Sequence, residues 1–269
     1  MGARIKDDVL IDPLYTIFAP AKVEANIKRS AELLNEENRR LGRTSKPIRF
    51  SIDEWNNRHA VYDGVKFGFT RKDNRRLFDV TTVAGMLNVF IRQSPAVGMA
   101  NYIFPVNGHG LIKTAGDDDA YKTPVYYVFE LYRRYMVGEK INVEVDGPGL
   151  SLPLGKLRVE GDMNSDVNGE TQELKFIDGA AVLTKDGNIN IALINRSHES
   201  GQRVRLNVPE GYYVKNIWKL EADDINAANS SNDRNRIVPE KKEFSSKKSQ
   251  IDLGISPCGF SLIQYSKEK

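Results

Sequence analysis

The first half of the chain alternates between helical and strand-like patterns of apolar residues. Apolar positions recur every three or four residues over 21–41 and again over 73–93, which predicts two amphipathic helices. A third helix is expected over 123–135, because Thr123 and Pro124 suit a helix cap and a first turn. Continuous apolar runs at 48–54 and 96–104 predict strands between these helices.

This alternation predicts a parallel α/β unit over residues 1–137. The unit contains two convincing strands and a frayed third before Pro20, which is too few to close a barrel. After Gly138 the pattern changes to short β-type runs, and Asp186-Gly187-Asn188 is a strong hairpin turn between two of them. A β-sandwich is therefore expected over residues 138–269. The runs are 157–159, 174–177, 180–184, 189–194, 204–208, 213–220 and 260–265.

Composition and charge narrow the classes of function. The 269 residues are 40% hydrophobic and 28% charged, and 39 Lys and Arg against 36 Asp and Glu leave a net charge of +3. The basic residues are spread along the chain, so neither nucleic acid nor an anionic membrane is expected as a partner. No apolar stretch has the length of a signal peptide or a membrane span, which predicts a cytoplasmic location. The single cysteine, Cys258, is expected to be a buried structural thiol.

The candidate chemistry lies where the two predicted strands end in polar residues. In a parallel barrel these ends form the active site, and here they carry Asp53-Glu54-Trp55-Asn56 and the segment 101–107. Because side chains alternate along a strand, Asp53 and Glu54 are expected to point to opposite faces, with Glu54 on the face of Ile52 and Phe50. Trp55 could add an apolar wall. An acidic strand end can equally be a turn or a helix cap.

The segment from Ile52 to Asn56 resembles the nucleophile strand of glycoside hydrolase family 51, the retaining α-L-arabinofuranosidases. Three further segments resemble the family in the same order along the chain. These are 87–92, 97–101 with Asn107 behind it, and 122–129. The resemblance implies that residues 1–137 are the C-terminal part of a (β/α)8 TIM barrel and that residues 138–269 are the family's C-terminal sandwich.

The resemblance implies a retaining mechanism with Glu54 as the nucleophile, and with Trp55, Asn56, Asn101 and Phe104 as substrate-binding residues. A second carboxylate, about 5 to 5.5 Å away, should act as acid and then as base. In the family it is a Glu in an Asn-Glu pair that ends a strand, whereas the Asn-Glu pair of this sequence lies inside the first predicted helix. Phe104 stands where many relatives have Gln, and Arg58 and His59 replace a second aromatic pair.

The remaining polar candidates have a simpler structural interpretation. His59, His109 and His198 lack the spacing of metal ligands, so neither a metal nor a cofactor is expected. Asp117, Asp118 and Asp119 are expected to form a solvated loop before a helix. Asn101 and Asn107 could bind sugar hydroxyls or satisfy loop backbone, and the resemblance favours binding for Asn101. The aromatic residues of 126–135 have helical spacing and are expected in the core.

Two hypotheses about function follow. The first is a glycosidase that releases terminal arabinofuranosyl groups from arabinan or arabinoxylan oligosaccharides, and that is incomplete without the acid/base segment. The second is an inactive product whose sandwich binds carbohydrate or mediates assembly. An open half barrel exposes strand edges and apolar surface, so either a homo-oligomer or a complementary N-terminal fragment is expected as a partner.

Overall fold

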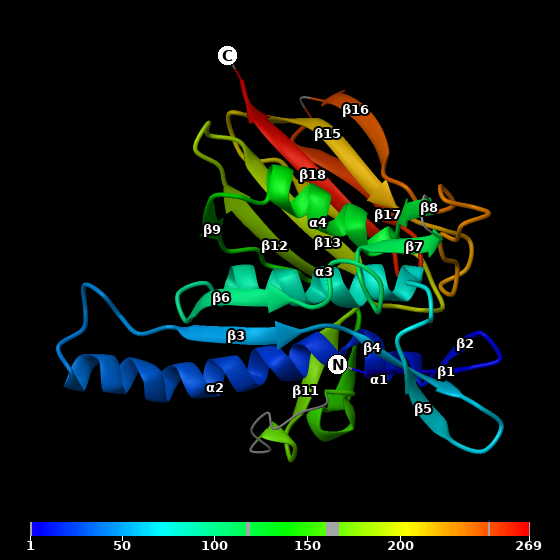
Figure 1. Ribbon diagram of the computed structural model, residues 1–269. Coiled ribbons are helices and arrows are strands. Elements are labelled where there is room, and N and C mark those ends of the chain that lie inside the picture. Colours follow the sequence, from blue (N-terminus) through cyan, green and yellow to red (C-terminus); the bar gives the residue numbers. More distant parts are fainter. Residues whose placement is uncertain (1, 117–118, 160–166, 247, 269) are drawn as a thin grey trace.

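The computed structural model describes residues 2–116, 119–159, 167–246 and 248–268. A large antiparallel sheet forms one end of the molecule, and helices with a small amount of parallel sheet form the other (Figure 1). The helix α3 (Leu77–Arg92) lies between these two parts and packs against three strands of the large sheet. Twelve of its sixteen residues are buried, which makes it the centre of the fold.

The N-terminal half follows the predicted alternation. Its helices and central strands are α1 (Pro13–Ile17), α2 (Ala19–Arg40), β3 (Phe50–Trp55), α3, β6 (Val97–Tyr102) and α4 (Pro124–Tyr135). The strands β3 and β6 pair in parallel, and α3 connects them. The three predicted helices and both predicted strands are confirmed, with their ends shifted by a few residues.

A second sheet of this half includes the frayed strand predicted before Pro20, but its other strands and their pairing were not predicted from the sequence. Its strands have the order β2-β1-β4-β5, and β1 pairs in parallel with β4. Their bounds are β1 (Gly2–Lys6), β2 (Val9–Ile11), β4 (Arg58–Tyr62) and β5 (Phe67–Thr70). The strands β7 (Ile112–Gly116) and β8 (Asp119–Lys122) form a separate antiparallel pair. Asp117 and Asp118, which were predicted to form a solvated loop, lie outside the described residues.

The C-terminal half is dominated by a six-stranded antiparallel sheet of order β16-β15-β18-β13-β12-β9. One face packs on α3 and α4, and the other packs on the two-stranded sheet β14-β17 through a second apolar cluster. The strands of these two sheets are β9 (Glu139–Ile141), β12 (Ile177–Leu183), β13 (Ile189–Asn195), β14 (Gln202–Asn207), β15 (Tyr212–Leu220), β16 (Glu240–Ser246), β17 (Gln250–Ile255) and β18 (Phe260–Lys267). The predicted hairpin at Asp186-Gly187-Asn188 joins β12 to β13.

A further antiparallel pair, β10 (Gly149–Pro153) and β11 (Thr171–Lys175), lies beside α2 (Figure 1). The strand predicted at 157–159 is wrong, because these residues form a loop that follows the short 3-10 helix η1 (Leu154–Lys156). The main hydrophobic core contains buried residues from both halves of the chain, the first being Ala3 and the last Leu262. Cys258 is fully buried in this core, and burial raises the pKa of its thiol to about 12.

Candidate functional site

Glu54 lies near the C-terminal end of β3, where the strand contains a bulge. Ile52 pairs with Ala100 and Trp55 with Tyr102, so β3 has one residue more than β6 over this interval. The extra residue leaves Asp53 and Glu54 both exposed, whereas Ile52 and Trp55 pack on the core. The register shift interrupts the strict alternation from which a shared face for Glu54 and Ile52 was predicted.

The two neighbouring carboxylates differ in their contacts. Asp53 accepts a hydrogen bond of 2.7 Å from the hydroxyl of Ser51. Glu54 has no hydrogen bond or ion pair with any residue that the structure describes. On the adjacent strand β6, Asn101 is exposed as well, and Phe104 follows the strand with 45% of its surface exposed. Three of the five predicted site residues are thus accessible at the same edge of the parallel strands.

Trp55 and Asn56 are buried beneath this edge. The Trp55 indole is 7% exposed, stacks on Phe129 at 6.0 Å and meets Tyr102 edge to face at 5.1 Å. The Asn56 amide donates to the carbonyl groups of Ile103 and His109. Both side chains therefore hold the strand end in place. A contact with substrate, as predicted for them, would require them to leave this packing.

One buried guanidinium joins the segments that follow β3 and β6. Arg75 is fully buried, and its Nε donates to the carbonyl of His109 at 2.8 Å. Its Nη1 donates to the carbonyl of Asn57 at 2.6 Å and to Asp79 Oδ1 at 3.0 Å. Its Nη2 also bonds the Asn56 side chain and, at 3.2 Å, the Tyr102 hydroxyl. The end of β3, the end of β6 and the start of α3 are thus held by a single side chain.

A buried imidazole completes this network. The Nδ1 of His59 lies 2.7 Å from Asp73 Oδ2, and its Nε2 lies 2.9 Å from Asp79 Oδ1. Burial disfavours the imidazolium, but the charge of Asp79 and the hydrogen bonds to both carboxylates outweigh it and raise the pKa of His59. His109 differs, because burial and the nearby charge of Arg75 lower its pKa to about 3. His59 is therefore the cation of the pair, and His109 is neutral.

These two histidines predict a maximum in stability near pH 6.5. Above the unfolded-state value of about 6.5, folded His59 keeps a proton that the unfolded chain has lost, so stability falls as the pH rises. Below it, folded His109 stays neutral while the unfolded chain gains a proton, so stability falls as the pH drops toward 3. The slope below pH 6.5 should approach ~1.4 kcal/mol per pH unit for one proton, and the slope above it has the opposite sign and at most this size.

Urea unfolding between pH 5 and 9 measures both slopes. His59→Asn should flatten the alkaline slope, and His109→Asn should flatten the slope between pH 5 and 6.5. The comparison concerns slopes and not absolute stability, because either substitution also removes hydrogen bonds. Unchanged slopes in both variants would contradict the assigned protonation states.

This network could not be predicted from local sequence patterns. His59 and His109 are 50 residues apart, yet the ring centroids lie 4.9 Å apart. The interpretation of His59 as a satisfied histidine is confirmed, whereas Arg75 and Asp79 had been treated only as part of a helix. The one local signal is the i,i+4 spacing of Arg75 and Asp79, which suits a pair at a helix start.

The other polar and aromatic residues considered in the sequence have structural contacts. Asn107 bonds the backbone and hydroxyl of Thr114, so it satisfies a loop. The loop predicted for Asp119 is wrong, because this residue begins β8 and pairs with Arg234. Of the aromatic residues predicted for the core, Tyr132 lies in it and Tyr127, Phe129 and Tyr135 pack against it, whereas Tyr126 is not part of it. The described residues contain no group of three His, Cys, Asp or Glu side chains that could hold a metal, and none of their helices is long and apolar enough to cross a membrane.

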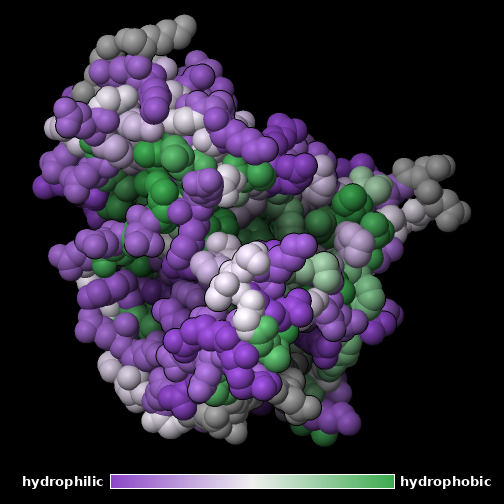
Figure 2. All heavy atoms as spheres, turned by 90° about the vertical axis from the view of Figure 1, so that its left-hand side faces the viewer, coloured by the Kyte–Doolittle hydropathy of each residue, from purple (hydrophilic) through white to green (hydrophobic). Residues whose placement is uncertain are grey.

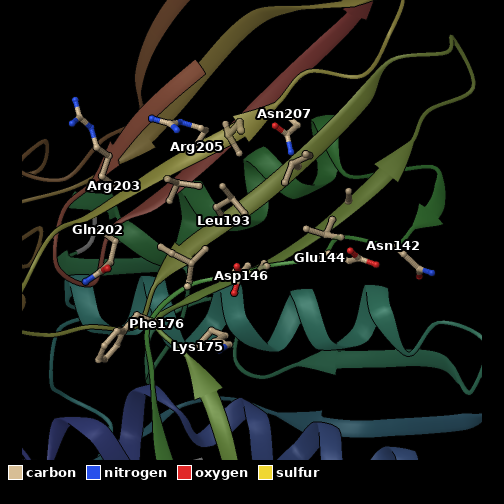
Figure 3. Close-up of a pocket in the computed structure, with 18 of the residues that line it drawn as sticks. Asn142, Glu144, Asp146, Lys175, Phe176, Leu193, Gln202, Arg203, Arg205 and Asn207 are labelled. Atoms are coloured by element: carbon tan, nitrogen blue, oxygen red, sulfur yellow. The ribbon is translucent and has the colours of Figure 1, made fainter. Parts of the chain in front are cut away.

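The sandwich contains a cavity of about 470 Å³ between β13 and β14. Its walls include Leu193, and polar residues such as Asn142, Glu144 and Gln202 lie around it (Figure 3). On the adjoining face of the molecule, hydrophobic residues are recessed among hydrophilic ones (Figure 2). The lining contains none of the five predicted site residues, so this cavity is separate from the edge that carries Glu54.

Comparison with known proteins assigns the chain to a family. The sequence model of the α-L-arabinofuranosidase C-terminal domain matches residues 53–258. The chain therefore belongs to the α-L-arabinofuranosidase C-terminal domain family, and it corresponds to the C-terminal portion of family 51 arabinofuranosidases. The resemblance stated from the sequence is confirmed.

Individual relatives agree with this assignment. The chain is 26% identical over 231 residues to a probable α-L-arabinofuranosidase C of Aspergillus niger. This match covers 84% of this chain and 43% of the relative. The chain is 25% identical over 200 residues to an exo-α-(1->6)-L-arabinofuranosidase of Bifidobacterium longum, with 70% and 35% covered. The fold matches the Thermotoga maritima α-L-arabinofuranosidase with a TM-score of 0.72 and 22% identity, over 98% of this chain and 52% of that one. The chain thus spans about half the length of these relatives or less.

Proposed function

We propose that this chain carries the nucleophile half of a retaining α-L-arabinofuranosidase, with Glu54 as the attacking carboxylate. The observation that supports the proposal most strongly is the bulge in β3, which leaves Glu54 exposed at the carboxyl edge of the parallel strands. The membership of the family and the names of the relatives support a terminal α-L-arabinofuranosyl group as the substrate class. Arabinan or arabinoxylan oligosaccharides are proposed as the polymers that carry it. Asn101 and Phe104 are proposed to contact the sugar.

The proposed catalytic unit is part of a (β/α)8 barrel. The βαβ arrangement of β3, α3 and β6 supports this, because a parallel barrel repeats such units. The Asn35-Glu36 pair lies within α2 and not at the end of a strand, so the acid/base carboxylate is proposed to come from a partner segment. A complementary N-terminal fragment would also cover the exposed Met99 on β6.

The alternative is a product without glycosidase activity whose sandwich binds carbohydrate. The cavity between β13 and β14 favours this reading, since it combines apolar walls with a polar rim. The two proposals differ in what they require of Glu54, because a binding module does not need a nucleophile.

A dinitrophenyl α-L-arabinofuranoside tests the nucleophile directly. Its phenolate leaves without protonation, so Glu54 can attack the anomeric carbon while the bond to the phenolate oxygen breaks. Without a base to activate water, the glycosyl ester should accumulate and appear in intact mass spectrometry as one added anhydropentosyl group on Glu54. Asp53→Asn should still form the adduct and Glu54→Gln should not. Labelling that persists in Glu54→Gln would reject the assignment.

A further inference from the structure

One face of the small sheet carries basic and aromatic side chains together. Register pairs place Arg4 beside Ala60 and Ala60 beside Phe69, and they place Tyr62 beside Phe67. Because alternate residues of a strand share a face, a single surface results. We call it the cation–aromatic face, and it consists of Arg4, Lys6, Arg58, Tyr62, Phe67, Phe69 and the adjoining Arg71 and Phe104. The opposite face, with Ala3, Ile5 and His59, is buried.

Each cation of this face lies against an aromatic ring. Arg4 is 5.3 Å from the centroid of Phe67, and Lys6 is 5.2 Å from that of Tyr62. Arg58 and Arg71 lie 5.6 and 5.8 Å from the centroid of Phe69, and Arg71 is also 5.2 Å from that of Phe104. These contacts orient the guanidinium groups before any ligand arrives, which lowers the entropy cost of binding.

The four cations lack acidic partners. Among the described residues, none forms an ion pair or a hydrogen bond with the side chains of Arg4, Lys6, Arg58 or Arg71. The rings remain accessible as well, since Phe69 is 55% and Phe104 45% exposed. The basic residues that are dispersed in the sequence thus form a local positive surface in the fold, on the hairpin that projects beside α1 (Figure 1).

From these contacts we infer that the cation–aromatic face binds a uronic acid-bearing glycan chain. A planar guanidinium can hold a carboxylate through two parallel hydrogen bonds, and exposed rings suit the apolar C–H face of a pyranose. The face is continuous with the candidate site, because the amide of Ile103 donates to the carbonyl of Trp55 at 3.2 Å and Phe104 follows directly. The inference extends the proposed function, since the acidic backbone of a substituted polymer would lie here while its side group reaches Glu54.

Affinity electrophoresis with polygalacturonate and with its carboxyl-reduced, neutral form tests this inference. The measurements use the full chain with Glu54→Gln, so that retention is read without turnover and does not depend on whether the chain is a hydrolase. Retention by polygalacturonate should exceed retention by the neutral polymer. Arg58→Gln with Arg71→Gln should weaken binding of the acidic polymer roughly tenfold for each guanidinium.

The matched control is Arg39→Gln with Arg133→Gln, which removes two exposed helical guanidiniums and the same charge. This control should retain nearly all binding. Equal retention by both polymers, or an equal loss in the control, would overturn the inference. Tighter binding to single-stranded DNA that is lost in the Arg58 and Arg71 variant would overturn it as well, because the face would then serve nucleic acid.

Discussion

The 269-residue chain alone is expected to hydrolyse aryl α-L-arabinofuranosides with poor leaving groups about 10² to 10⁴ times more slowly than an enzyme with both carboxylates. The reason is that the departing oxygen receives no proton from Asn35-Glu36, which lies within α2. A series of phenyl glycosides with decreasing leaving-group pKa measures the effect. The rate should rise steeply along the series, and the dinitrophenyl member should react fastest.

An external nucleophile provides the control for this prediction. Azide needs no base, so it should release the glycosyl group from Glu54 and raise turnover of the dinitrophenyl substrate, while leaving the slowest substrates unaffected. Full activity on poor leaving groups that disappears in Glu54→Gln would contradict the prediction. It would mean that another carboxylate of this chain supplies the proton.

Local patterns predicted the elements of the fold well. Helical spacing over 73–93 corresponds to α3, and the hairpin signal at Asp186-Gly187-Asn188 lies at the turn between β12 and β13. The small sheet escaped prediction because its pairing is not local: β1 lies beside β4, more than fifty residues away. The strand predicted at 157–159 was wrong because a short apolar run does not reveal whether a neighbouring strand is available to pair with it.

The candidate site was predictable in position but not in geometry. The polar end of 48–54 pointed to Glu54, yet the bulge that exposes both carboxylates depends on the register with β6. Likewise, the sequence shows Arg58 and Arg71 as ordinary surface charges. Only the pairing of β4 with β5 brings them over the same ring, that of Phe69. Both features depend on strand pairing, between the distant strands β3 and β6 in the first case and within the β4–β5 hairpin in the second.

Arg75→Met is expected to destabilise the protein by about 3 to 5 kcal/mol. The guanidinium is fully buried and its removal leaves Asp79, which is also fully buried, with one cation fewer. Removal also leaves the carbonyl groups of Asn57 and His109 without this donor. The free energy of unfolding from urea titration at pH 6.5 measures the effect, and Arg133→Met on the exposed surface of α4 should change it by less than about 0.5 kcal/mol.

A double-substitution cycle separates the ion pair from general packing. Asp79→Asn retains its shape but loses the charge, so Arg75→Met combined with Asp79→Asn should cost clearly less than the sum of the two single changes. Additive costs would mean that Arg75 stabilises the fold through its carbonyl contacts instead of through Asp79. In either case the ends of β3 and β6 should loosen together, because the same guanidinium contacts Asn57 and Tyr102. Faster amide exchange at both strand ends in Arg75→Met, but not in Arg133→Met, would identify Arg75 as the residue that positions Glu54.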